Sequence, residues 1–348
     1  MNTLTVQLKN RSYDIIVGAG CLHVVNERIQ NESIFMLFDE NIQQYAESIT
    51  SSASMAFQAT EKNKVLSSIE TVCQSMRMEG IDRTSALIAM GGGVMGDVGG
   101  YAAASYMRGI GCIQIPTTLL AMVDASIGGK TGVNMQGDDG VLFKNMIGAF
   151  YQPCLVIADL DTLQTLPEKE FRAGLAEIIK YGVISDASLF DYLEKNTEKV
   201  LRLDKECLEY IIKTSCSIKA EVVEKDEREN HYRMILNFGH TIGHAIEALT
   251  SYSQFIHGEA VAIGMVYAAK LSQKLGKCQE GIPRRLDRLV RKFGLPADLP
   301  DLHSKAIIES LYHDKKTMNH KIKFILVKEI GIVEIVDDMP EEKIISIL

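Results

Sequence analysis

The stretch Ala86-Leu87-Ile88-Ala89-Met90-Gly91-Gly92-Gly93-Val94-Met95-Gly96-Asp97 decides the fold of the first half of the chain. Its first five residues form an unbroken apolar run, which is typical of a strand buried on both faces of a parallel sheet. Three glycines follow at once, and the small residues at 98–105 predict a helix. A strand that passes through glycines into a helix is the repeating unit of a doubly wound α/β fold.

The segments around this stretch repeat the alternation of strand and helix. A second apolar run, at 34–38, ends at Asp39, and residues 62–78 have the periodicity of a helix. Further strands are predicted at 4–8, 13–17 and 112–116. We therefore expect residues 1–160 to form an α/β domain with a doubly wound, mostly parallel sheet.

The character of the sequence changes after residue 160. Pro167 begins a helical pattern, and helical periodicity then continues over most of the chain to Phe293. The pattern breaks near 185–186, at 226–230 and at 252–257, and two short strands are predicted at 322–326 and 332–335. Because 348 residues are more than one core usually serves, we expect residues 161–348 to form a second, mainly helical domain.

The composition excludes several classes of protein. With 46% hydrophobic and 24% charged residues the chain is an ordinary globular protein, and its net charge of −8 argues against nucleic acid as a partner. The seven cysteines are scattered, without a C-x-x-C pair, which indicates reduced thiols. The sequence shows no signal peptide and no apolar run long enough to cross a membrane, so a cytoplasmic protein is expected.

Two glycine-rich segments could hold an anion. The glycines at 91–93 open a helix, where free N–H groups and positive potential favour phosphate, although the spacing is neither G-x-G-x-x-G nor a Walker A loop. Residues 126–132 are expected to form a second such loop, with Lys130 as a partner for phosphate or carboxylate. A tight structural turn and a solvated lysine remain the alternatives. Two such loops in one α/β domain favour a phosphate-bearing ligand.

A group of histidines points to a metal. His240 and His244 are four residues apart and share one face of a predicted helix, and His257 follows shortly after. Glu177 stands on an otherwise apolar helix face, where a carboxylate is costly unless it is paired or bound to a metal. Lys180, nearly one turn later, could neutralise it. Spacing alone favours both helix histidines as ligands.

Taken together, these motifs closely resemble the 3-dehydroquinate synthase family of the sugar phosphate cyclase superfamily. The resemblance runs in order from about residue 34 to 330 and is carried by residues 91–97, 107–109, 115–121, 128–134, 144–145, 147–151, 236–241 and 257–261. It implies the conversion of 3-deoxy-D-arabino-heptulosonate 7-phosphate to 3-dehydroquinate and phosphate, in the shikimate pathway. The enzyme would be a phosphorus–oxygen lyase that uses NAD and one divalent metal, zinc or cobalt, and would form a homodimer.

The resemblance also implies a reaction course and a role for individual residues. The course is transient oxidation by NAD, β-elimination of phosphate, re-reduction and an intramolecular aldol closure. The metal ligands would be Glu177, His240 and His257, which moves His244 from the metal to the substrate. Residues on the substrate side would be Arg108, Lys130, Lys180, Lys219, Arg233, Asn237, His244 and Lys316. Cofactor contacts would come from Asp39, Asn41, Glu61, Lys64, Gly93, Val94, Met95, Gly96, Asp97, Thr117, Thr118, Asp124, Lys130, Lys144, Asn145, Thr162, Leu163, Gln164 and Thr165.

The chain departs from the family pattern at two places, and other functions stay open. The link at 135–143 is longer than usual, and 230–232 replace a glycine-containing turn, with His231 expected at the surface. Either Lys315 or Lys316 could face the substrate. The rival functions are another sugar phosphate cyclase, a metal-dependent polyol dehydrogenase that would release NADH stoichiometrically, and a non-catalytic nucleotide-binding protein, against which the set of metal ligands speaks.

Overall fold

The chain forms two compact units. The computed structural model describes residues 1–29, 33–137, 142–251, 254–313 and 321–348. Unit 1 comprises Met1–Pro167 and Leu208–Glu224, and unit 2 comprises Glu168–Cys207 and Lys225–Leu348. The predicted division into residues 1–160 and 161–348 stays a prediction. The two compact units are not continuous in sequence, because unit 1 also includes the later segment 208–224.

Unit 1 is built on a seven-stranded sheet with the order β1-β2-β9-β6-β5-β3-β4. Only β1 and β2 are antiparallel to each other, and the remaining pairs are parallel, which confirms the predicted doubly wound, mostly parallel sheet. The strands are β1 (Asn2–Val6), β2 (Tyr13–Gly18), β3 (Ile34–Asp39), β4 (Ala53–Phe57), β5 (Ala86–Gly91), β6 (Gly111–Pro116) and β9 (Leu155–Asp159).

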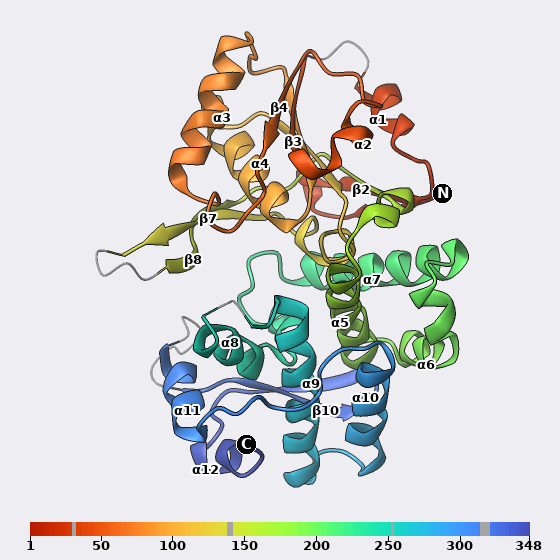
Figure 1. Ribbon diagram of the computed structural model, residues 1–348, viewed down its shortest axis with the longest axis vertical. Helices are drawn as coiled ribbons and strands as arrows, with labels where there is room; N and C mark the ends of the chain where they lie inside the picture. The colour runs from red at the N-terminus through yellow and green to blue at the C-terminus, as the bar shows by residue number, and fades with distance from the viewer. Residues whose placement is uncertain (30–32, 138–141, 252–253, 314–320) are drawn as a thin grey trace. The chain divides into compact units, whose positions relative to one another are not determined.

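Both faces of this sheet are covered. Along β5, Ile88 and Met90 belong to one core cluster, and Leu87 and Ala89 belong to another. The first cluster includes residues of α1, and the second includes residues of α3 and α4, on the opposite side of the sheet in Figure 1. A strand buried on both faces has no polar position, which explains the unbroken apolar runs.

The helical elements of unit 1 are mostly short. They are α1 (His23–Arg28), α2 (Gln43–Ala46), α3 (Leu66–Met78), α4 (Gly93–Ser105), the 3₁₀ turns η1 (Lys9–Arg11), η2 (Glu40–Ile42), η3 (Tyr106–Arg108) and η5 (Leu160–Thr165), and the π turn η4 (Ala121–Ala125). The helix α7 (Lys205–Lys225) contributes its segment 208–224, in which the Cys216 thiol donates to the Met122 carbonyl.

Several sequence-based boundaries were wrong for identifiable reasons. The helix predicted at 62–78 begins at Leu66, because Val65 is extended and the preceding residues form a turn. The helix predicted at 98–105 begins at Gly93, because Gly92 acts directly as its N-cap. The first strand ends at Val6 rather than Leu8, whose carbonyl accepts from Arg11 in a turn.

The second glycine-rich segment is only partly a loop. Lys130 begins β7 (Lys130–Gln136), which pairs antiparallel with β8 (Leu142–Phe150) as a two-stranded ribbon. A Cβ on Gly148 would lie 2.1 Å from the Thr131 carbonyl oxygen, so glycine is needed where the two strands approach. The predicted loop at 126–132 was therefore wrong at its end, because glycines required by strand pairing resemble glycines of a phosphate loop.

Unit 2 is mainly helical, as predicted. Its elements are α5 (Glu168–Ile184), α6 (Ala187–Leu201), η6 (Tyr232–Asn237), α8 (His240–Leu249), α9 (His257–Lys274), α10 (Gly281–Lys292), α11 (Ser304–His313), α12 (Glu341–Ile345) and the hairpin of β10 (Phe324–Glu329) and β11 (Ile332–Val336). Residues of α8, α9, α11 and β10 share one core cluster. None of the helices in the described part of the chain combines the length and apolar character that a membrane span requires.

The helices α8 and α9 pack backbone to backbone. A Cβ on Gly264 of α9 would lie 1.9 Å from the carbonyl oxygen of Gly239, the N-cap of α8. Gly258 approaches α5 equally closely, since its Cβ would lie 2.1 Å from the Ala173 carbonyl oxygen. These close approaches bring the start of α8 against α9 and the start of α9 against α5, and each of the three helices carries one of the predicted metal ligands.

Candidate active site

The Glu177 carboxylate is the centre of a buried polar cluster in unit 2. Its side chain is 0% exposed, and neither carboxylate oxygen has a hydrogen-bond partner among the described residues. Lys180, three residues later on α5, forms an ion pair with Oε2 and is itself buried. Since a buried carboxylate without hydrogen bonds is costly, Oε1 is suited to binding a cation.

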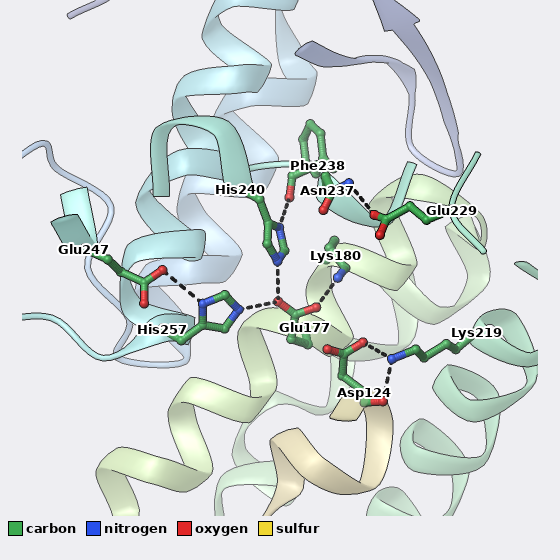
Figure 2. Close-up of polar contacts among 10 residues, drawn as sticks. All are labelled: Asp124, Glu177, Lys180, Lys219, Glu229, Asn237, Phe238, His240, Glu247 and His257. Carbon is green, nitrogen blue, oxygen red and sulfur yellow. Dashed lines mark hydrogen bonds and ion pairs between the residues drawn. The ribbon is translucent and has the colours of Figure 1, made fainter. Parts of the chain in front are cut away.

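Two imidazoles face this oxygen. Glu177 Oε1 lies 3.7 Å from Nε2 of His240 and 3.8 Å from Nε2 of His257. Figure 2 shows both rings turned toward this carboxylate. The His240 ring is fixed by its Nδ1, 3.2 Å from the Phe238 carbonyl oxygen. The His257 ring is fixed by its Nδ1, 3.2 Å from Oε2 of Glu247.

The spacing of these three atoms fits one small cation. Two atoms bound to the same tetrahedral zinc ion lie about 3.3 Å apart, given bond lengths near 2.0–2.1 Å. Glu177, His240 and His257 each offer one ligand atom within 4.8 Å of the others. One carboxylate and two imidazoles are a donor set that suits zinc or cobalt and leaves a position open for a substrate. The structure thus brings together the three residues that the resemblance gave as ligands.

A second arrangement of ligand atoms shares His257. His244, Glu247 and His257 also lie close enough to hold a metal ion. The His244 ring is half-buried, and its centroid is 5.4 Å from that of His240 and 6.2 Å from that of His257. The two helix histidines are one turn apart on α8, and both lie near His257, since the His240 ring centroid is 5.2 Å from that of His257.

A loop before α8 carries two further predicted residues. Asn237 donates through its side-chain amide to Glu229 Oε1 at 3.1 Å. Arg233 is buried and donates to the Glu227 carbonyl at 2.6 Å. The Asp226 carboxylate accepts from the backbone N–H groups of Asn230, His231 and Arg233, which shapes the loop. The His231 side chain is exposed, as the sequence suggested.

Burial and the backbone hydrogen bonds that Asp226 accepts shift the pKa of its carboxyl group in opposite directions. Burial raises the pKa of this carboxyl, but the three N–H donors and the nearby Arg233 guanidinium outweigh burial and lower it overall. The ionised form of Asp226 is therefore the one that accepts the three backbone hydrogen bonds of this loop.

In unit 1, the glycines at 91–93 lie where the sequence placed them. Gly91 ends β5 with a φ of +152°, and a Cβ on it would lie 2.4 Å from Met95 Cγ and 3.2 Å from Asp39 Cβ. Gly92 offers no side-chain cap to α4, so the first N–H groups of the helix are available to an anion. Of the predicted cofactor contacts, Gly93, Val94, Met95, Gly96 and Asp97 form the first turns of α4.

Neighbouring strand ends bring further predicted cofactor residues to this point. Asp39 ends β3, next to β5, and its Oδ1 accepts from the backbone and the side-chain amide of Asn41. Thr117 follows β6 on the other side and donates its N–H to the Gly91 carbonyl at 2.9 Å. Thr118 accepts from the Ala121 N–H. The carboxyl ends of parallel strands where the order changes are the usual site of a dinucleotide.

A second group of predicted residues is joined by direct contacts. Lys64 is buried, forms an ion pair with Asp97 and donates to Asn145 Oδ1 at 2.6 Å. Burial raises the pKa of the Asp97 carboxyl, and Lys64 opposes that rise. Glu61 accepts from the Asn134 side chain at 2.8 Å. The ribbon β7–β8 is thereby tied to the first turns of α4.

The remaining predicted residues lie at separate places. In unit 1, Lys219 donates to the Asp124 carbonyl at 2.5 Å and forms an ion pair with its carboxylate. The turn η5, which follows β9, contains Thr162, Leu163, Gln164 and Thr165. The first two of these residues are buried, and the last two are exposed. Lys130 and Lys144 stand on the ribbon. Arg108 belongs to η3, which follows the C-terminal end of α4. Lys315 and Lys316 lie outside the described residues.

Sequence reasoning missed one charged residue that contacts a predicted ligand. Glu247 is buried on α8 and pairs with His257 from α9. It stands three residues after His244 and seven after His240, so helical spacing could have placed it on the histidine face. The glutamate was overlooked because the partner that explains its burial comes from another helix.

Solved structures show which class of protein has this fold. The 2-epi-5-epi-valiolone synthase of Streptomyces hygroscopicus subsp. jinggangensis, with NAD+ and Zn2+ bound, has a TM-score of 0.88 and 27% identity over 98% of this chain and 97% of that one. A 2-deoxy-scyllo-inosose synthase complexed with carbaglucose-6-phosphate, NAD+ and Co2+ has a TM-score of 0.88 and 28% identity over 99% of each chain. The maleylacetate reductase of a Rhizobium strain, at 14% identity and a TM-score of 0.67, shares the fold alone. The architecture is that of the sugar phosphate cyclases.

Sequence relatives narrow this class to one family. The family model described as 3-dehydroquinate synthase N-terminal matches residues 54–173, and the C-terminal model matches residues 174–317. The 3-dehydroquinate synthase of Desulforamulus reducens is 45% identical over 362 aligned residues, covering 100% of this chain and 99% of that protein. That of Thermoanaerobacter pseudethanolicus is 44% identical and covers 100% of both. The chain belongs to the 3-dehydroquinate synthase family, which confirms the resemblance.

Proposed function

We propose that the protein converts 3-deoxy-D-arabino-heptulosonate 7-phosphate to 3-dehydroquinate and phosphate, as a lyase of the shikimate pathway. The observation that carries the proposal is the fully buried Glu177 carboxylate facing Nε2 of His240 and of His257, in a chain that matches 3-dehydroquinate synthases over its whole length.

The proposed metal ligands are Glu177, His240 and His257. When bound there, zinc or cobalt supplies Lewis acidity that polarises a substrate oxygen. The fit rests on Oε1 of Glu177, a buried acceptor without a hydrogen bond that faces two nitrogen donors. The Phe238 carbonyl and Glu247 contact the Nδ1 atoms of the two rings, and both Nε2 atoms face Glu177 Oε1.

NAD, proposed as the hydride acceptor and donor, would be held in unit 1. Its pyrophosphate suits the N–H groups at the start of α4, where Gly92 and Gly93 allow a close approach. Asp39, at the carboxyl end of β3, is a carboxylate suited to ribose hydroxyl groups. The other proposed contacts are those given by the family resemblance, and NAD+ is present in the two cyclase structures.

The chain's cations are proposed to bind the two anionic groups of the substrate. Arg233 and Lys180 in unit 2, and Lys130 and Lys219 in unit 1, can form charge-assisted hydrogen bonds with phosphate or carboxylate oxygens. The roles proposed for Arg108 and Lys316 rest on the family resemblance alone. A cation fixed before the substrate arrives orients it at a smaller entropic cost than one that must be recruited.

His244 is proposed to move a proton or to bind the substrate. It is half-buried, and its imidazole lies next to that of His240. Imidazole exchanges protons readily near neutral pH, as ring opening and aldol closure require. Asn237, held by Glu229, can donate or accept a hydrogen bond at a substrate hydroxyl.

The test is turnover with the heptulosonate phosphate, zinc and a trace of NAD. We expect more phosphate released than NAD supplied, no net NADH, and 3-dehydroquinate as the product. Stoichiometric NADH would show a polyol dehydrogenase instead. A non-catalytic nucleotide-binding protein would turn over no sugar phosphate, and removing its metal with a chelator would change nothing but its stability.

Another cyclase activity is the second candidate, because the two solved cyclases with this fold carry names that denote other products. Turnover of a different sugar phosphate, with none of the heptulosonate, would establish it. The proposal includes a homodimer, which light scattering of the purified protein tests. It also includes a cytoplasmic location, which agrees with seven cysteines that form no disulfide and is tested by cell fractionation.

A further inference from the structure

The Glu247 carboxylate lies behind the proposed metal ligand His257. Its Oε2 is 3.2 Å from His257 Nδ1, on the opposite side of the ring from the Nε2 that faces Glu177, as Figure 2 shows. Glu247 comes from α8, the helix that supplies His240, whereas His257 is the first residue of α9. One helix thus provides one ligand directly and contacts the ligand of the next helix.

The burial of Glu247 needs an explanation. Its side chain is 8% exposed, although an ionised carboxylate in such surroundings is expensive unless it is paired. In the core of unit 2, α8 otherwise contributes apolar residues such as Ile242 and Ile246. A carboxylate at this position is therefore better explained by its histidine partner than by packing.

The contact decides which nitrogen of His257 carries the proton. A carboxylate can only accept a hydrogen bond, so a neutral His257 must donate from Nδ1 and keep the lone pair on Nε2. Nε2 is the atom that faces Glu177, so the lone pair points to where a cation would bind. A carboxylate behind a ligating histidine also raises the basicity of the ring.

We propose that Glu247 is a positioning residue that fixes the tautomer and ring orientation of His257 and thereby raises the affinity for the divalent metal. The inference rests on the metal site of the proposed function. Glu247 acts through His257 and does not touch the metal. In the alternative arrangement His244, Glu247 and His257 would themselves be the ligands, and the experiment below distinguishes the two.

The experiment compares the full-length protein with Glu247→Ala, Glu247→Gln and a control, Glu259→Gln. Glu259 is a carboxylate at the start of α9 that accepts from the Ile256 N–H and pairs with Lys169 at 3.3 Å. Glu259→Gln therefore removes the same charge near His257, while the amide oxygen can still accept from Ile256. The zinc dissociation constant is measured by competition with a chromophoric chelator. The His257 tautomer is read from imidazole ¹⁵N shifts of the metal-free protein, assigned by their loss in His257→Ala.

We expect Glu247→Ala to weaken zinc binding about 10- to 100-fold and to abolish the preference for the Nδ1–H tautomer. Glu247→Gln should weaken zinc binding less, because the amide oxygen still accepts from Nδ1. Glu259→Gln should change zinc binding less than about twofold, since its carboxylate contacts Ile256 and Lys169 rather than one of the three proposed ligands. Zinc affinity and tautomer unchanged in Glu247→Ala would overturn the inference.

Two outcomes separate this inference from the proposed function. If the unaltered protein binds no zinc or cobalt, the proposed metal site fails, and the inference fails with it. If Glu247→Ala abolishes binding while Glu177→Ala retains it, Glu247 is itself a ligand, and the visible spectrum of the cobalt form should show the changed donor set.

Discussion

Glu177 and Lys180 form an ion pair on one turn of α5 in which both side chains are withdrawn from solvent, at 0% and 2% exposure. Removing one partner leaves a buried charge uncompensated, which costs about 3–5 kcal/mol. We therefore predict that Lys180→Met lowers the free energy of unfolding of the metal-free protein by about that amount, measured with urea.

The matched control is the double variant Glu177→Gln/Lys180→Met, which removes both charges. It should recover most of the loss, because two neutral groups of similar size replace the pair. Equal stability of the single and the double variant would show that the ion pair contributes nothing in this environment. Adding zinc should narrow the deficit of the single variant, since a cation would again neutralise Glu177.

Substitutions of His257 and His244 should have different effects on metal binding and on turnover. His257→Ala is expected to lose bound metal, because Nε2 of His257 faces Glu177. His244→Ala is expected to keep the metal and to turn over poorly. Metal content after gel filtration and the rate of phosphate release measure the two properties. Similar metal loss in both variants would instead favour the arrangement of His244, Glu247 and His257.

The glycine at the crossing of α8 and α9 should tolerate no side chain. A Cβ on Gly264 would lie 1.9 Å from the Gly239 carbonyl oxygen, so Gly264→Ala must push the helices apart. We predict a loss of about 1–3 kcal/mol in urea unfolding, with weaker metal binding. Gly281, at the start of α10, has nothing within 4 Å of its Cβ position, so Gly281→Ala is the control and should be neutral or slightly stabilising. A neutral Gly264→Ala would contradict the close crossing.

Asp226 should make the stability of unit 2 depend on pH. Its folded-state pKa lies below the ordinary value of about 3.9, so the carboxylate stabilises the fold above that pH. The contribution is lost as the pH falls from about 3.9 through the folded-state pKa. Asp226→Asn should therefore cost about 1–3 kcal/mol at pH 7 and flatten the dependence of unfolding free energy on pH below 4.

Asp204 provides a comparison for this variant. It is also a carboxylate of lowered pKa that accepts a backbone N–H, from Cys207, but it lies at the start of α7 and away from Arg233. Asp204→Asn should cost stability without loss of turnover, whereas Asp226→Asn should lose both, because its loop carries Arg233. Equal turnover in the two variants would show that the Asp226 loop does not hold Arg233 for the reaction.

Much of unit 1 could be predicted because buried parallel strands leave a simple signal. The apolar runs that became β3 and β5 have no polar position, and the glycines after β5 mark the turn into α4. The strand β4 was missed because Ala53–Phe57 lies at the sheet edge and is half exposed. The hairpin β7–β8 was missed because Gly132, which is needed where its two strands approach each other, was assigned to the loop predicted at 126–132.

The residues of the candidate metal site could be predicted from the sequence, but their arrangement in space could not. The spacing of His240 and His244 indicated a metal, but helical spacing could not show which ring would turn toward Glu177. The choice depends on how α5, α8 and α9 pack, and that packing depends on close backbone approaches at Gly258 and Gly264. The role of Glu247 could not be predicted for the same reason, because its partner, His257, belongs to another helix, α9.

The assignment of residues 208–224 to unit 1 has a consequence for biosynthesis. The first 167 residues leave the ribosome without the helix that supplies Cys216 to Met122 and Lys219 to Asp124. The nascent chain must then carry part of the second unit, Glu168–Cys207, before that helix emerges. Co-translational folding of unit 1 therefore cannot finish until residue 224 has left the exit tunnel, and the surface that α7 covers stays accessible to chaperones until then.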